Sequence, residues 1–165
     1  MLATLSERLL APAGIGADDR AALLRTALRL RRAVHEGSVT RVLAGRHVAI
    51  ASGAGPTPAE GLFERAALQL GARVSRIAPD LLRADTAPMR PAAARLLPRL
   101  YDAVDCHLGE ACHALALQLQ SGVPVYLALA GTQHPIRALL VDMPDDDPDA
   151  ALTSLVQAVL VETLA

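Results

Sequence analysis

The spacing of apolar and polar positions predicts alternating helices and strands along most of the chain. Residues 17–34 place leucines among arginines at helical spacing, which predicts an amphipathic helix that Gly37 ends. The short apolar run 47–51 predicts a buried strand. Residues 58–71 predict a helix, and 73–77 predict a second strand. This order is typical of a parallel sheet whose strands are joined by helices.

The second half of the chain continues the alternation. The pattern predicts a loop over 78–91, a helix over 92–100 and a third strand over 101–106. It then predicts a helix over 109–120, a turn and fourth strand over 122–126, and a short helix that begins at His134 and Pro135. We therefore predict an α/β fold, a three-layer α/β/α domain with a short parallel sheet. Ligands of such sheets bind outside the carboxyl ends of the strands, so the candidate site segments are 53–60, 106–109 and 129–137.

The C-terminal part of the chain changes character after Met143. Residues 144–149 are rich in Asp and Pro and predict an acidic linker. The segment 150–165 carries one continuous apolar stripe at helical spacing, with Asp147 as a candidate cap. We expect this terminal helix to pack back on the domain formed by residues 1–143, because the stripe must be buried.

Composition narrows the function classes. The 165 residues carry a formal charge of -1 and only 2% aromatic residues, which argues against a nucleic-acid partner. The sequence has no Lys, which excludes a Schiff-base lysine and a Walker-type phosphate-binding lysine. No apolar run reaches the roughly 18 residues of a membrane span, and the N-terminus has no signal-peptide pattern. We therefore expect a cytoplasmic protein with no membrane partner and no cofactor.

Two cysteines and two histidines form the one candidate metal cluster in the sequence. Cys106, His107, Cys112 and His113 lie within eight residues, with Glu110 between them. Their spacing matches no standard zinc motif, and free Cys is commonly a small buried apolar residue. We therefore predict no metal site, although the sequence leaves metal binding by these residues open.

The helix that begins near residue 58 carries distinctive start signals. Thr57 fits the N-cap, Pro58 the first helical position and Glu60 the third, so the segment predicts a capping box. The preceding Gly53 and Gly55 give only a weak dinucleotide-binding motif, because the third glycine is missing and two prolines intrude.

Several ordered motifs resemble the ornithine and aspartate carbamoyltransferases. Residues 43–50 read LAGRHVAI, similar to the family's L-x-G-K-x-x-A-x, and 99–104 read RLYDAV, similar to R-M-x-D-x-I. GVPV at 122–125 and the His134-Pro135 pair resemble the family's G-V-P-V and H-P-x-Q segments. The resemblance runs from about residue 11 to 143 and again over 150–165, where the last helix is similar to that of the ornithine enzymes.

This resemblance carries expectations about organisation. It implies that residues 1–143 correspond to the N-terminal, carbamoyl-phosphate-binding half of a carbamoyltransferase. The family's second domain, which binds the amino acid, is expected to be missing between Met143 and the terminal helix. Family members form trimers through the first half, so we expect a homo-oligomer, with a full-length carbamoyltransferase as another candidate partner.

The resemblance also shows which ligand-binding positions have changed. The family's phosphate-binding S-T-R-T-R aligns with residues 56–60, where only Thr57 matches and Glu60 replaces an arginine. His107 replaces an arginine, His134 is retained, and Arg137 replaces the glutamine of H-P-x-Q. The candidate ligand-binding set is Gly55, Pro56, Thr57, Pro58, Ala59, Glu60, His107, His134 and Arg137, and no catalytic residue is assigned beyond the vestigial His107, His134 and Arg137.

Because most phosphate donors are absent, we expect a non-catalytic binding, assembly or regulatory subunit. The alternative is an enzyme or small-ligand binder that uses the remodelled pocket, including residual carbamoyl phosphate binding in amino acid metabolism. The two altered charges suggest an ion pair between Glu60 and Arg137 that fills the old site. The competing possibility is that both side chains point to solvent.

Overall fold

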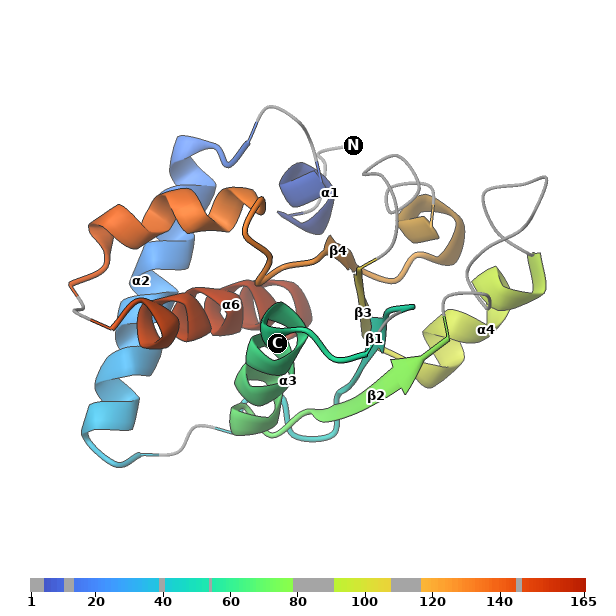
Figure 1. Cartoon of the computed structure of the whole chain (residues 1–165), viewed down its shortest axis with the longest axis horizontal. Coiled ribbons are helices and arrows are strands. Elements are labelled where there is room, and N and C mark those ends of the chain that lie inside the picture. The colour runs from blue at the N-terminus through green and yellow to red at the C-terminus, as the bar shows by residue number, and fades with distance from the viewer. Residues whose placement is uncertain are drawn as a thin grey trace.

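A computed structural model describes residues 5–10, 14–38, 41–53, 55–78, 91–107, 117–144 and 147–165. Its centre is a four-stranded sheet in the order β2-β1-β3-β4 (Figure 1). The strands are β1 (His47–Ala51), β2 (Arg73–Ile77), β3 (Ala103–Cys106) and β4 (Val125–Leu127), and all neighbouring pairs are parallel. The α/β class with a short parallel sheet is therefore confirmed.

The strand register places the predicted site segments along one edge of the sheet. Ala51 pairs with Ile77 on one side and with Cys106 on the other, and Cys106 pairs with Leu127. These residues end their strands, so the segments that follow β1, β3 and β4 leave the sheet next to one another.

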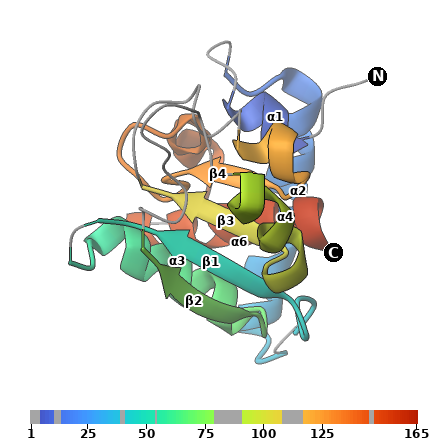
Figure 2. The same cartoon turned by 90° about the vertical axis from the view of Figure 1, so that its right-hand side faces the viewer.

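Helices cover both faces of the sheet. Figure 2 shows α4 (Pro91–Leu100) on one side, and α3 (Pro58–Gln69) and α6 (Pro148–Leu164) on the other. A small apolar cluster, which includes Leu97 of α4 and Leu117, packs on the α4 face. The larger core lies on the opposite face and joins α2 (Ala17–His35), α3, α6 and the 3₁₀ helix η2 (Pro135–Asp142), with α1 (Leu5–Leu10) at its margin.

The terminal helix α6 is the central helix of the larger core (Figure 1). It begins where the Asp147 carboxylate accepts hydrogen bonds from the backbone N–H groups of residues 149 and 150. All six residues of the predicted apolar stripe are buried: Leu152, Leu155, Val156, Val159, Leu160 and Leu164. Polar contacts at the far end, from Thr26 to Glu162 (2.5 Å) and between Tyr126 and Thr163 (2.5 Å), join α6 to α2 and β4. The division into domain, linker and terminal helix stays a prediction.

Some element boundaries differ from the sequence-based prediction. The third strand begins at Ala103 rather than at residue 101, because the Asp102 side chain accepts the backbone N–H of His47 at 2.8 Å. The predicted loop over 78–91 and helix over 109–120 fall largely outside the described residues. None of the helices in the described ranges is both long and apolar enough to cross a membrane.

Candidate functional site

The N-terminus of α3 forms as the sequence predicts, but only half of the capping box is present. Thr57 has extended backbone dihedrals, and its Oγ1 accepts the backbone N–H of Glu60 at 3.2 Å. Pro58 occupies the first helical turn. The Glu60 carboxylate is directed elsewhere and forms an ion pair with a strand residue.

That partner is Arg76 of β2. Glu60 is 1% exposed, and its Oε2 accepts a hydrogen bond from Arg76 Nη1 at 2.5 Å. Arg76 Nη2 also donates to Glu64 Oε2 at 2.8 Å. The hydrogen bonds that Arg76 donates to Glu60 and, with a smaller effect, to Glu64 raise the pKa of Arg76. The ion pair with Arg76 therefore holds the buried Glu60 carboxylate in place in the first turn of α3.

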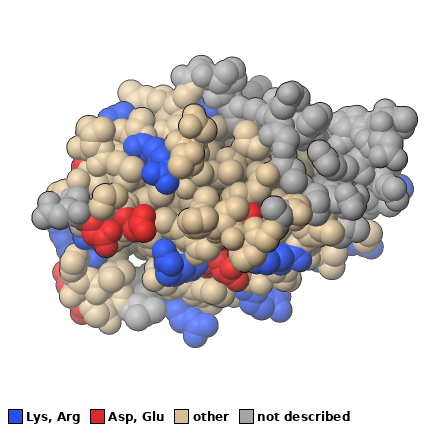
Figure 3. Space-filling model, viewed as in Figure 1, with Lys and Arg blue, Asp and Glu red and all other residues tan. Residues whose placement is uncertain are grey.

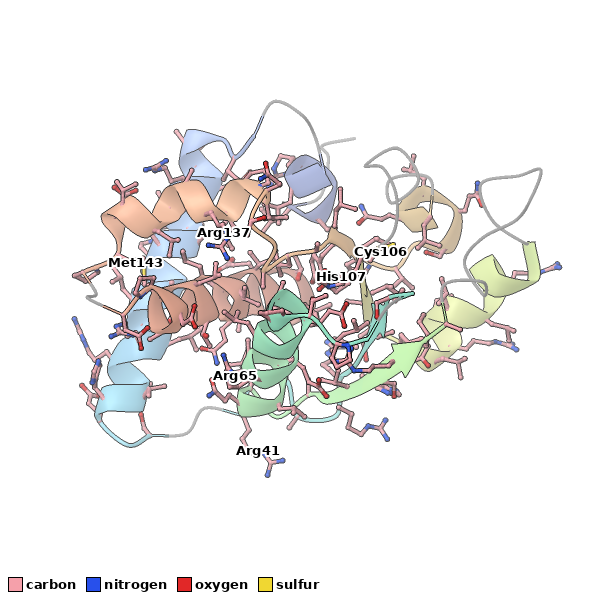
Figure 4. All side chains as sticks on the ribbon, viewed as in Figure 1. Arg41, Arg65, Cys106, His107, Arg137 and Met143 are labelled. Atoms are coloured by element: carbon pink, nitrogen blue, oxygen red, sulfur yellow. The ribbon has the colours of Figure 1, made fainter. Side chains whose placement is uncertain are left out.

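The predicted ion pair between Glu60 and Arg137 was wrong. Arg137 lies in η2, and its guanidinium donates to the backbone carbonyls of Gly131 (2.9 Å) and Ala130 (3.3 Å). It thereby holds the segment that follows β4, in a different part of the molecule from His107 (Figure 4). The loop carbonyls of this turn supply acceptors that no pattern of side-chain charges could indicate.

A second carboxylate positions His107 beside Glu60. Asp105 of β3 is fully buried, and its Oδ1 accepts the backbone N–H of Leu129 at 2.9 Å. Its Oδ2 lies 2.8 Å from His107 Nε2, and His107 Nδ1 lies 3.9 Å from Glu60 Oε1. Burial lowers the pKa of His107, but the hydrogen bond and charge of Asp105, with Glu60, outweigh it, so the pKa is raised.

The structure therefore brings together some of the predicted site residues and separates others. Glu60 and His107 meet, together with Asp105 and Arg76, which the sequence analysis missed. Gly55, Pro56, Thr57 and Pro58 are exposed and Ala59 is partly exposed, all at the mouth of α3. The one signal for Asp105 was its place as a lone carboxylate in an otherwise apolar strand.

His134 caps η2 and is buried there. Its Nδ1 accepts the backbone N–H of Ile136 at 3.2 Å, and 7% of the residue is exposed. Burial lowers its pKa to about 4, so the ring is neutral and carries its proton on Nε2. Nε2 has no hydrogen-bond partner among the described residues. A buried N–H donor is therefore available to a ligand or water at this point.

Protonation of His134 should destabilise the fold in acid. The pKa of His134 is about 4 in the folded chain and about 6.5 in the unfolded chain. As the pH falls below about 6.5, the unfolded chain gains a proton at this position that the folded chain gains only near pH 4, so the folded chain loses stability over this range. His134→Asn keeps an acceptor for the cap but cannot titrate. We expect this variant to lose about 2 kcal/mol less stability than the unaltered protein between about pH 7.5 and 5. Urea unfolding of both proteins across this range measures the difference. Parallel pH profiles for the two proteins would contradict this assignment.

The candidate metal cluster is only partly described. Cys106 is buried, whereas Cys112 and His113 lie outside the described residues. Within the described ranges, no group of three His, Cys, Asp or Glu side chains is arranged to hold a metal ion.

No protein-family model matches the chain. Among curated proteins, it is 30% identical over 117 residues to the catabolic ornithine carbamoyltransferase of Mycoplasma capricolum subsp. capripneumoniae. It is 32% identical over 119 residues to the catabolic enzyme of Chromobacterium violaceum, and 32% over 123 residues to the ornithine carbamoyltransferase of Ignicoccus hospitalis. These matches cover 71%, 71% and 74% of this chain but only 38%, 35% and 40% of the relatives.

Solved structures agree with this relationship. The ornithine carbamoyltransferase of Pyrococcus furiosus superposes with a TM-score of 0.69 at 25% identity, over 86% of this chain and 45% of that one. The enzyme of Thermus thermophilus gives 0.65 at 25% identity, over 84% and 47%. The fold is thus that of one carbamoyltransferase domain. The chain is a homologue of the ornithine carbamoyltransferases and spans about two-fifths of the length of the curated relatives it matches.

Proposed function

We propose that this chain is a non-catalytic carbamoyltransferase homologue that acts as a binding, assembly or regulatory subunit. The observation that supports this proposal most directly is the position of the Glu60 carboxylate, which is buried in the first turn of α3 and accepts a hydrogen bond from Arg76 at 2.5 Å. By the resemblance, this helix start is the family's phosphate-binding segment. A carboxylate at that place repels a phosphate, because both are anions in a region of reduced dielectric.

The loss of donors supports the same proposal. Helix N-termini bind phosphate through free backbone N–H groups, often with a charged side chain. Pro56 and Pro58 have no N–H, and the N–H of Glu60 is taken by Thr57 Oγ1. Each charge-assisted hydrogen bond that is lost removes roughly 1.5–3 kcal/mol of binding free energy. Losing three would weaken a micromolar ligand to millimolar or beyond.

We further propose a cytoplasmic homo-oligomer, with a trimer as the form that the resemblance implies. A complex with a full-length carbamoyltransferase is the other assembly that a non-catalytic homologue would form. These proposals rest on the relationship to the ornithine enzymes and on the resemblance of the first half of the chain.

A second candidate function is favoured by His134. Its buried Nε2–H lacks an acceptor among the described residues, and a buried donor without a partner costs about 1–3 kcal/mol. A small ligand with a carbonyl or carboxylate oxygen would supply that acceptor. The remodelled pocket would then bind a ligand other than carbamoyl phosphate, or bind carbamoyl phosphate weakly.

Thermal unfolding with carbamoyl phosphate tests the first proposal. A ligand present at about 100 times its dissociation constant stabilises a protein by about 2.7 kcal/mol, which is several degrees in Tm for a domain of this size. We expect less than about 1 °C for this chain at 0.5 mM, roughly a saturating dose for a micromolar ligand. The Chromobacterium violaceum enzyme serves as the positive control. A shift of several degrees in this chain, together with carbamoyl transfer to ornithine, would overturn the non-catalytic proposal.

A further inference from the structure

A groove with one apolar end and one charged end lies away from the candidate site. The apolar end is a cavity of about 260 Å³ between α2, α3 and α6, lined by Leu30, Ala33, Val34, Gly37, Leu70 and others. The charged end is a cavity of about 390 Å³ beside it. Val34, Gln69 and Gln157 line both cavities, so the two cavities adjoin. Figure 3 shows the hollow between an acidic and a basic patch.

The charges of this groove are segregated by element. The helices α2 and α3 contribute the basic side chains Arg31, His35 and Arg65, and the cap and first turn of α6 contribute Asp147 and Asp149. Neither Arg65 nor Asp149 has a side-chain hydrogen bond or ion pair with any described residue, and they do not pair with each other. Figure 4 shows Arg65 beside α3, on the side that faces α2. The charged end of the groove is therefore lined by a cation from α3 and an anion from α6, neither of which has a side-chain partner among the described residues.

Gln157 lies where the two cavities join. It is 4% exposed, and its Nε2 donates to Gln69 Oε1 at 2.9 Å and to the Ala66 carbonyl at 3.4 Å. Its own Oε1 accepts no hydrogen bond from the described residues. A buried amide that lines a cavity and keeps a free acceptor is suited to a ligand donor such as an ammonium group.

We propose that this groove binds a free α-amino acid with an aliphatic side chain. The ligand carboxylate pairs with Arg65, its ammonium with Asp149 and Gln157 Oε1, and its side chain enters the apolar cavity beside Leu30 and Leu70. An amino acid offers a partner to Arg65 and to Asp149 at once, because it carries a carboxylate and an ammonium group on the same carbon. A simple anion leaves Asp149 and Gln157 without a partner, and a simple cation leaves Arg65 without one.

The aliphatic class follows from the apolar cavity. Transfer of a branched aliphatic side chain from water into such a cavity contributes roughly 1.5–3 kcal/mol. A side chain that ends in an ammonium group, as in ornithine, would bury a charge with no carboxylate among the residues that line the apolar end. The proposal therefore excludes the amino acid that the relatives' names specify, and it does not depend on the state of Glu60.

Calorimetric titration of the whole chain with L-leucine tests this proposal. We expect saturable binding with a dissociation constant below about 1 mM. Isocaproate lacks the ammonium group, isopentylamine lacks the carboxylate, and glycine lacks the side chain. Each of these, and ornithine, should bind at least about tenfold more weakly. Absence of saturable binding up to about 10 mM L-leucine, or equal affinity for isocaproate, would overturn the proposal.

Two groove variants and one control locate the site. Arg65→Gln and Asp149→Asn change exposed side chains without described partners, so both proteins should fold and should lose at least about tenfold in affinity for L-leucine. Arg25→Gln makes the same change of charge on the exposed face of α2, away from the groove, and should bind as the unaltered protein does. Unchanged affinity in both groove variants would place any binding elsewhere and contradict the assignment.

Discussion

Replacing Leu155 with Ala is expected to lower the free energy of unfolding by about 3–5 kcal/mol. Leu155 is fully buried in α6, and α6 is the element through which α2 and α3 share one core. The substitution removes apolar contacts and leaves a cavity that rigid neighbouring helices cannot fill. Urea unfolding followed by circular dichroism measures the loss. This is the largest single-residue effect that we predict.

A matched control separates this effect from a general effect of truncation. Val141 is 81% exposed at the end of η2, and Val141→Ala should change the stability by no more than about 0.5 kcal/mol. If Leu155→Ala cost less than about 1 kcal/mol, α6 would not be part of the cooperative core, and the packing of the terminal helix described above would be wrong.

Removing Arg76 is expected to have the second-largest effect, because it leaves the Glu60 carboxylate buried without its cation. Breaking one side of a fully buried ion pair costs about 3–5 kcal/mol. The Arg76 side chain is 38% exposed, so water can replace part of its interaction, and we expect Arg76→Met to cost about 2–3 kcal/mol. The exposed pair with Glu64 adds little to this value.

A double-mutant cycle attributes the cost to Glu60. Glu60→Gln removes the charge that Arg76 neutralises, so Glu60→Gln with Arg76→Met should be at least about 1 kcal/mol more stable than Arg76→Met alone. Arg73→Met is the control on the same strand, since Arg73 is exposed and should tolerate the change within about 0.5 kcal/mol. Simple additivity of the two single changes would show that the ion pair does not hold Glu60 in place.

Local signals explain why much of the fold could be predicted. The strands β1 and β2 begin and end where expected. β1 is a short apolar run, and β2 is a short segment with the β-branched residues Val74 and Ile77 that follows the turn at Gly71. The start of α3 was equally accessible, since Thr57 and Pro58 encode the cap and the first turn within two adjacent residues. Information of this kind is carried by neighbours in sequence.

The contacts of the candidate site depend on tertiary structure and were harder to predict. Glu60 and Arg76 belong to different elements and meet because β2 pairs with β1, in a register that places Arg76 opposite Ile50. Arg137 was assigned to Glu60 on charge alone, but a nearby turn presents two backbone carbonyls to it. A pattern of charged residues gives no information about backbone acceptors. The prediction that Arg137 pairs with Glu60 was therefore wrong.

The resemblance and the structure contribute different parts of the account. The resemblance indicated which positions align with the phosphate-binding segment of the family, and the structure shows what these positions contact. Of the altered positions, Glu60 and His107 meet at the carboxyl ends of the strands, whereas Arg137 serves the segment after β4. The proposed loss of anion binding therefore rests on Glu60 and His107 and not on Arg137.

The most direct test of the central claim is a crystal structure of the chain soaked with phosphonoacetamide, a stable mimic of carbamoyl phosphate. Our account predicts that Glu60 stays hydrogen bonded to Arg76 beside His107 and that no phosphonate occupies the start of α3. A phosphonate seated on the backbone of residues 56–60, with the Glu60 carboxylate displaced from Arg76, would contradict it.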